Sequence, residues 1–261
     1  MKFFGKDKPG SNSVIKGVPF ESVSFSQGCA LAPCFLRYCA ESIETKSTYF
    51  NKECENFEDS GDIPCFGIGI EEAISVIEKE AEEIFKNKKF GIFIGGDHTI
   101  TYPIFKSAKK FYPDLKLLIL DAHTDFRNEF MGSELNHATW LKNLYKEKII
   151  KDKEVYIYGV RENFPETPFS LIKDIKELKN LKGNFYLSFD LDVFEPSVFS
   201  SLSTPFPGGI FFKEAIDILS ILAKNLIGVD FVEYNPLRGD ALNSGIILAT
   251  LIREFIVLIS D

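Results

Sequence analysis

The segment Lys116-Leu-Leu-Ile-Leu-Asp-Ala-His-Thr-Asp125 carries the clearest indication of how this chain folds. Its interior between Lys116 and Asp121 is continuously apolar, which is typical of a strand buried on both faces of a sheet. Strands of this kind belong mainly to parallel sheets that helices cover on both sides. Because the segment then becomes polar at once, it predicts a buried strand that delivers carboxylates and an imidazole to one edge of such a sheet.

Short apolar runs of the same kind recur on both sides of this segment and alternate with helical periods. The predicted strands span residues 13–18, 90–95, 116–121, 154–160, 184–190 and 226–233. The predicted helices span residues 71–86, 212–224 and 242–258. This alternation predicts an α/β fold, a three-layer α/β/α sandwich with a mostly parallel central sheet. No linker or repeat interrupts the pattern, so residues 1–261 are expected to form a single domain.

The composition excludes several classes of protein and partner. The chain has 261 residues, of which 45% are hydrophobic and 26% charged, and its mean hydropathy is −0.01. These values are typical of globular proteins and exclude disordered, collagen-like and membrane-bundle chains. With 30 basic and 38 acidic residues the net charge is −8, so nucleic acid is not an expected partner, whereas a cationic substrate is compatible.

No segment resembles a targeting or membrane signal. The N-terminus lacks the apolar core of a signal peptide, and the apolar stretch 246–259 contains Arg253 and Glu254. The five cysteines are odd in number and match no zinc or iron–sulfur spacing, which indicates reduced thiols. We therefore expect a cytoplasmic protein without membrane association.

Chemistry-bearing side chains follow four of the predicted strands. In parallel sheets, ligands bind beyond the carboxyl ends of the strands, so residues at these ends converge on one rim. Asp121, His123 and Asp125 alternate, which projects them to the same face of an extended segment. Asp190 and Asp192 repeat this spacing after a second strand. The candidate metal ligands are His98, Asp121, His123, Asp125, Asp190 and Asp192.

Four aspartates and two histidines are too many ligands for one ordinary ion, and two ions bridged by shared carboxylates fit better. Oxygen-rich ligands with a minority of imidazole favour Mn²⁺, with Co²⁺, Fe²⁺ or Zn²⁺ as substitutes. A paired centre holds hydroxide at neutral pH, so the residues by themselves predict a two-metal hydrolase. The open alternative is a set of charged loops without a metal.

The same segments resemble those of the ureohydrolase family, the arginases and agmatinases, and the similarity extends from residue 17 to residue 236. The matching strings are Gly95-Gly-Asp-His-Thr-Ile-Thr-Tyr-Pro103, Asp121-Ala-His-Thr-Asp125, Ser188-Phe-Asp-Leu-Asp192 and Val232-Glu-Tyr-Asn-Pro236. The resemblance implies an arginase-like fold, a homotrimer or homohexamer, and two Mn²⁺ per subunit. One ion would take His98, Asp121, Asp125 and Asp190, and the other Asp121, His123, Asp190 and Asp192.

The resemblance also implies roles in catalysis. A bridging hydroxide, hydrogen-bonded to Asp125, would attack the guanidinium carbon of the substrate. Glu233 would hold the guanidinium nitrogens, and His137 would contact the substrate and pass a proton to the leaving amine. The products would be urea and a primary amine.

The sequence around His137 is most similar to that of agmatinases, since Gly132-Ser133 precede this histidine. The expected reaction is therefore the conversion of agmatine to putrescine and urea, a step of polyamine biosynthesis. The distal ammonium would meet Glu162, with other candidates at Glu129, Glu134 and Glu166. Two segments depart from the family pattern: the family's Asp-Pro is replaced by Glu195-Pro196, and residues 200–203 read Ser-Ser-Leu-Ser. These differences leave the longer amine N1-aminopropylagmatine open as an alternative substrate.

The sequence also leaves four alternative functions open. They are an arginase, a formiminoglutamase, a guanidinobutyrase that uses Arg127 as its distal cation, and a catalytically silent metal-binding oligomer.

Overall fold

The computed structural model describes residues 2–5, 7–162 and 166–260. Within this part of the chain, eight strands form one sheet in the order β2-β1-β3-β8-β7-β4-β5-β6, and every neighbouring pair is parallel. The strands are β1 (Ser13–Val18), β2 (Phe57–Asp62), β3 (Phe90–Gly95), β4 (Lys116–Leu120), β5 (Val155–Tyr158), β6 (Ser170–Ile172), β7 (Phe185–Asp190) and β8 (Leu226–Val232). The predicted α/β class and parallel sheet are confirmed.

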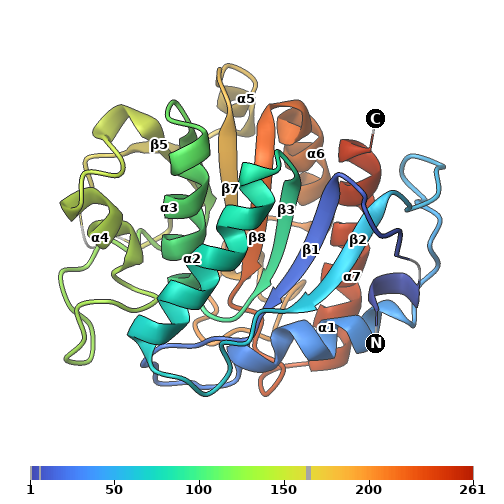
Figure 1. Ribbon diagram of the computed structural model, residues 1–261, viewed down its shortest axis with the longest axis horizontal. Coiled ribbons are helices and arrows are strands. Elements are labelled where there is room, and N and C mark those ends of the chain that lie inside the picture. Colours follow the sequence, from blue (N-terminus) through green and yellow to red (C-terminus); the bar gives the residue numbers. More distant parts are fainter. Residues whose placement is uncertain (1, 6, 163–165, 261) are drawn as a thin grey trace.

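Helices cover both faces of the sheet and complete the three layers (Figure 1). They are α1 (Ala32–Ala40), α2 (Ile70–Lys86), α3 (Thr101–Phe111), α4 (Trp140–Lys146), α5 (Ile175–Leu178), α6 (Phe212–Leu222) and α7 (Ala241–Ile259). One hydrophobic cluster packs α2, α3 and α4 on the first face, and a second packs α1, α6 and α7 on the other. Burial of apolar surface on both faces explains why the strands read as nearly continuous apolar runs.

The sequence prediction missed strand β2 because its residues, Phe57-Glu-Asp-Ser-Gly-Asp62, are mostly acidic or small. Tertiary structure stabilises this edge strand through the buried Arg37 of α1. The Arg37 guanidinium donates to Asp59 Oδ2 at 2.8 Å and to Asp62 Oδ1 at 2.5 Å. Since a charge pair between elements distant in sequence has no local signature, the strand could not be recognised from hydrophobic periodicity.

Helix α7 is, among the described residues, the one helix long and apolar enough to cross a membrane. However, 61% of its 18-residue apolar window is buried, and the helix packs against α1 and α6. Its two buried charged side chains pair with each other, as the Arg253 Nε–Glu254 Oε1 distance of 3.1 Å shows. This is the packing of a core helix.

Candidate metal centre

The turn after β3 brings His98 to the carboxyl edge of the sheet. Gly96 lies so close to the loop after β1 that a Cβ atom at this position would meet the carbonyl oxygen of Phe20 at 1.7 Å. Glycine is therefore required there by close backbone approach. The next residue, Asp97, caps a short 3-10 helix (His98–Ile100) by accepting a hydrogen bond from Thr99 N at 3.0 Å. The result is a His98 side chain that is only 1% exposed.

The turns after β4 and β7 are shaped by the aspartates themselves. Asp121 Oδ1 accepts a hydrogen bond from His123 N at 2.6 Å, and Asp190 Oδ1 accepts one from Asp192 N at 2.8 Å. Asp125 has a φ of 47°, in the left-handed region that aspartate tolerates better than most residues. These turns bring the ligand side chains that follow β4 close to Asp190 and Asp192, which follow β7.

All six predicted ligands meet at one place. The Nδ1 atom of His98 lies 3.2 Å from Asp121 Oδ2, 3.0 Å from Asp125 Oδ2 and 3.0 Å from Asp190 Oδ2. The Nδ1 atom of His123 lies 2.7 Å from Asp192 Oδ2 and 3.5 Å from Asp121 Oδ1. The arrangement forms two adjoining groups of ligand atoms, and Asp121 belongs to both.

The buried carboxylates of this cluster repel one another, so their ionised forms are unfavourable unless a positive charge lies between them. Burial, together with the neighbouring Asp192 and Asp125 carboxylates, raises the pKa of Asp121 to about 6. The pKa of Asp190 is also raised, by burial and by the same kind of carboxylate neighbours. Among the described residues, His98 Nδ1 and Asp121 Oδ2 are buried without a hydrogen-bond partner, although they face each other. Oxygen donors around an orphaned imidazole nitrogen, with a second imidazole among carboxylates beside it, fit divalent cations, so the residues present suit a metal pair.

A chain of buried hydrogen bonds orients His98 from behind. Its Nε2 atom lies 2.8 Å from Ser188 Oγ, which in turn donates to Asp230 Oδ1 at 2.6 Å. Tyr186 OH donates to the other oxygen of Asp230 at 2.8 Å. Because the Ser188 proton is committed to the carboxylate, Ser188 accepts from Nε2–H, and the lone pair of His98 is left on Nδ1. This is the tautomer that a metal at the cluster needs.

Trp140 supports the same cluster in a way that the sequence did not suggest. Its side chain is fully buried in the core. In addition, its Nε1–H donates to Asp125 Oδ2 at 2.9 Å, and its ring centroid lies 4.6 Å from that of His98. No local pattern distinguishes a core tryptophan from one that also fixes a ligand.

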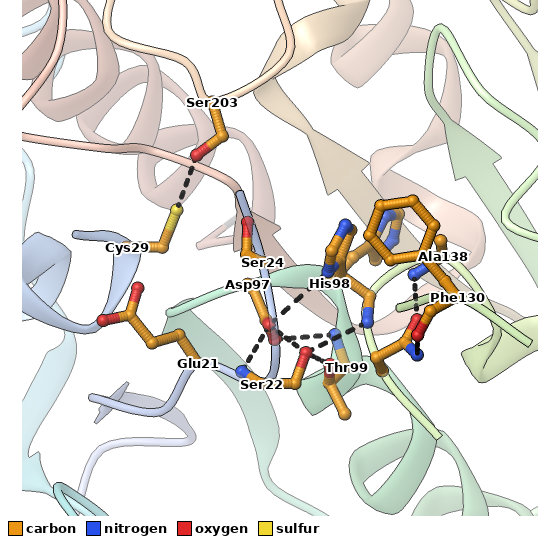
Figure 2. A network of polar contacts seen from close by, with 12 residues as sticks. Glu21, Ser22, Ser24, Cys29, Asp97, His98, Thr99, Phe130, Ala138 and Ser203 are labelled. Carbon is orange, nitrogen blue, oxygen red and sulfur yellow. Dashed lines mark hydrogen bonds and ion pairs between the residues drawn. The ribbon is translucent and has the colours of Figure 1, made fainter. Parts of the chain in front are cut away.

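Glu233 and His137 lie beside the cluster. Glu233 has a φ of 69°, and its Oε1 accepts a hydrogen bond from His98 N at 2.7 Å. Burial and the nearby Asp97 carboxylate raise the pKa of Glu233 to about 7, although His137 opposes this shift. Cys29 Sγ lies 3.6 Å from Glu233 Oε2 and also contacts Ser203, as the dashed line in Figure 2 shows. A buried carboxylate in this position is suited to hold a cationic group.

A small cavity of about 90 Å³ opens from the cluster to the surface. Glu162 lines the cavity, but both of its carboxylate oxygens already have partners within the protein. Its Oε1 accepts from Thr124 N at 2.9 Å, and its Oε2 lies 3.8 Å from Arg127 Nη2. The other glutamates considered for the distal end of a substrate, Glu129, Glu134 and Glu166, are exposed and are not among the residues that line the cavity. Its lining comprises His123, Asp125, Arg127, Phe130, His137, Ala138, Glu162 and Thr204.

The departure at Glu195 has a structural explanation. Its Oε2 accepts hydrogen bonds from Gly208 N at 2.7 Å and Gly209 N at 3.1 Å, so the longer side chain closes the turn opposite. Arg161 stabilises the same region by donating to Asp192 O at 2.6 Å and Phe206 O at 2.8 Å. Both residues therefore shape the rim of the site from outside the ligand cluster.

Comparisons with known proteins show to which family the chain belongs. A sequence model described as the Arginase family matches residues 11–258. Agmatinase from Bacillus anthracis is 30% identical over 279 aligned residues, which cover 98% of this chain and 96% of the relative.

Two solved structures share the fold. The agmatine ureohydrolase of Thermoplasma volcanium matches with a TM-score of 0.86 at 25% identity, covering 96% of this chain and 90% of that one. The formiminoglutamase of Trypanosoma cruzi, crystallised with Mn²⁺, matches with a TM-score of 0.86 at 18% identity, covering 98% and 96% of the two chains. The chain belongs to the arginase family, whose members are hydrolases that act on the carbon–nitrogen bonds of linear amidines.

Proposed function

We propose that this enzyme hydrolyses agmatine to putrescine and urea with two Mn²⁺ ions per subunit. The observation that carries the proposal is the convergence of the six predicted ligands in two adjoining groups, one of them around the orphaned Nδ1 atom of His98, next to Glu233 and His137. One ion would be held by His98, Asp121, Asp125 and Asp190, and the second by Asp121, His123, Asp190 and Asp192. A cytoplasmic location and assembly as a homotrimer or homohexamer belong to the same proposal.

When bound, the metal pair supplies a nucleophile at neutral pH, because divalent cations lower the pKa of coordinated water. The protein's own residues then bind and orient the substrate. Glu233, buried and held by His98 N, would pair with the guanidinium and orient its carbon toward the ligand cluster. Asp125, fixed by Trp140, accepts a hydrogen bond from the attacking group. His137, which lines the cavity, gives a proton to the departing amine.

The distal end of the substrate distinguishes agmatine from its alternatives. Agmatine and N1-aminopropylagmatine end in cationic amines, which favour the Glu162 side of the cavity, whereas 4-guanidinobutanoate ends in a carboxylate, which favours Arg127. The overall charge of −8 supports the cationic substrates. The pair Glu162–Arg127 at 3.8 Å keeps a guanidinobutyrase as the second candidate.

The test is urea release by the Mn²⁺-loaded enzyme on agmatine, N1-aminopropylagmatine, arginine, 4-guanidinobutanoate and formiminoglutamate, the last by formamide release. We expect turnover with agmatine or its aminopropyl derivative, and at least tenfold lower kcat/KM with the substrates that carry a carboxylate. Preference for 4-guanidinobutanoate would refute the proposed substrate and leave the reaction class intact. Two bound metals without turnover of any substrate would favour a catalytically silent protein.

A further inference from the structure

The loop between β1 and α1 contributes a hydroxyl group that none of the predicted roles uses. Ser22 lies on this loop, where it contacts two other loops of the carboxyl edge (Figure 2). One contact is with Asp97 and Thr99, which follow β3, and the other is with the backbone of His137, which follows β4. Ser22 therefore connects the proposed proton donor to the segment that carries the first metal ligand.

The hydrogen bonds of Ser22 can be worked out from its neighbours. Asp97 Oδ2 accepts from both Ser22 N and Ser22 Oγ, each at 2.6 Å. Since a carboxylate has no proton to give, the single Ser22 proton goes to Asp97. The Ser22 oxygen then accepts from Thr99 Oγ1–H at 3.0 Å and from His137 N–H at 3.3 Å. Every hydrogen-bonding position of the hydroxyl is used.

The same contacts bring a carboxylate to the His137 ring. Asp97, 2% exposed, has its Oδ2 4.0 Å from His137 Nδ1, an atom that is buried and has no hydrogen-bond partner among the described residues. On another side, the ring of Phe130 meets the imidazole edge-to-face at a centroid distance of 5.2 Å. Ser22 thus fixes both the backbone position of His137 and the position of the Asp97 carboxylate beside the His137 ring.

We propose that Ser22 is a positioning residue for His137, which it holds at the cavity by fixing the His137 backbone and the Asp97 carboxylate together. The proposal rests on the proton-donor role proposed for His137. It assigns Ser22 no contact with substrate or metal, so its removal changes kcat and leaves metal content unchanged.

The decisive experiment is a double-mutant cycle between Ser22→Ala and His137→Ala, measured as kcat on the best substrate with Mn²⁺ saturating. A general acid contributes about 100- to 10,000-fold, so partial misplacement is expected to lower kcat about 10- to 100-fold. KM should change less than about threefold, because ground-state binding is left intact. In the His137→Ala background, Ser22→Ala should cost nothing further. Additive losses, an unchanged kcat, or loss of metal would overturn the proposal.

Two variants control for general effects on folding. Ser22→Thr keeps the hydroxyl, and Ser22 borders a surface groove of about 290 Å³, so activity should stay near wild type. Ser60→Ala removes a half-buried hydroxyl that bonds Ile15 O on β1, and it should leave kcat unchanged. If Ser22→Ala does not fold, Ser22→Cys replaces the hydroxyl by a weak donor and should still lower kcat.

Amide hydrogen exchange separates this proposal from the proposed function. The His137 amide donates to Ser22 Oγ, so its exchange should accelerate in Ser22→Ala and stay slow in Ser22→Thr and Ser60→Ala. This measurement needs no substrate. Unchanged exchange in Ser22→Ala would refute the positioning role, whereas accelerated exchange in an enzyme that turns over no guanidino compound would refute only the proposed function.

Discussion

Replacing Asp230 by asparagine is expected to weaken metal binding although this residue touches no predicted ligand. Asp230 is fully buried and accepts hydrogen bonds from Ser188 Oγ at 2.6 Å and Tyr186 OH at 2.8 Å. Through Ser188 it holds the proton of His98 on Nε2. An asparagine offers one acceptor oxygen in place of two and carries no charge. The Ser188 bond then becomes an ordinary neutral bond, and the preference for the metal-binding tautomer weakens.

The size of the effect follows from the two bonds. A charge-assisted hydrogen bond is worth roughly 1.5–3 kcal/mol against about 1 kcal/mol for a neutral one. Loss of about 1–1.5 kcal/mol at His98 corresponds to a roughly tenfold weaker metal affinity. Tyr186→Phe is the matched control, because it removes one donor to Asp230 and leaves the Ser188 bond charge-assisted; we expect less than about a threefold change.

The assay is titration of the metal-free protein with Mn²⁺, followed by calorimetry or by competition with a chelator. Circular dichroism and thermal melting of the metal-free variants establish that the fold is retained. An Asp230→Asn protein that folds and binds both ions with wild-type affinity would refute the reasoning. If Ser188→Ala nevertheless weakened metal binding, Ser188 would orient His98 without help from Asp230.

Four further outcomes are expected. Asp190→Asn should lose at least one ion and nearly all turnover, measured by metal analysis and urea release; retained activity would contradict the shared-ligand scheme. His137→Ala should keep both ions and lose at least about 100-fold in kcat, whereas loss of metal would identify it as a ligand. Glu162→Gln should raise KM for agmatine more than for arginine in parallel assays, and equal changes would remove it from the distal subsite. The folded-state pKa of Asp121 is raised to about 6 and that of His123 to about 12, so at these two groups the metal-free fold binds more protons between pH 4 and 8 than the unfolded chain. The Tm of metal-free protein should therefore fall as pH rises from 4 to 8, an effect that Mn²⁺ reverses and that a flat profile would contradict.

Much of the fold was predictable because the central strands are buried on both faces. Continuous apolar runs such as residues 116–120 need no partner to be recognised, and β1 and β3 have the bounds that the sequence predicts. Helices α1, α3 and α4 also escaped prediction, and the two strands that did so, β2 and β6, form the edges of the sheet. Strand β2 is stabilised by Arg37, and β6 has only three residues, too few for a hydrophobic period.

The sequence by itself determined the ligand types and their spacing, because polar residues that directly follow buried parallel strands gather at one edge of the sheet. His98, Asp121 and Asp190 were recognisable from short motifs for that reason. The extended alternation expected for residues 121–125 is not observed, since β4 ends at Leu120 and turns follow it. Only the tertiary structure decided which atoms face the cluster and what holds them there. Trp140, Asp230 and Ser22 reach their partners across 15, 42 and 75 residues of sequence, respectively. Hydrogen bonds over such separations leave no periodic signal, since they depend on how loops from different strands meet in space.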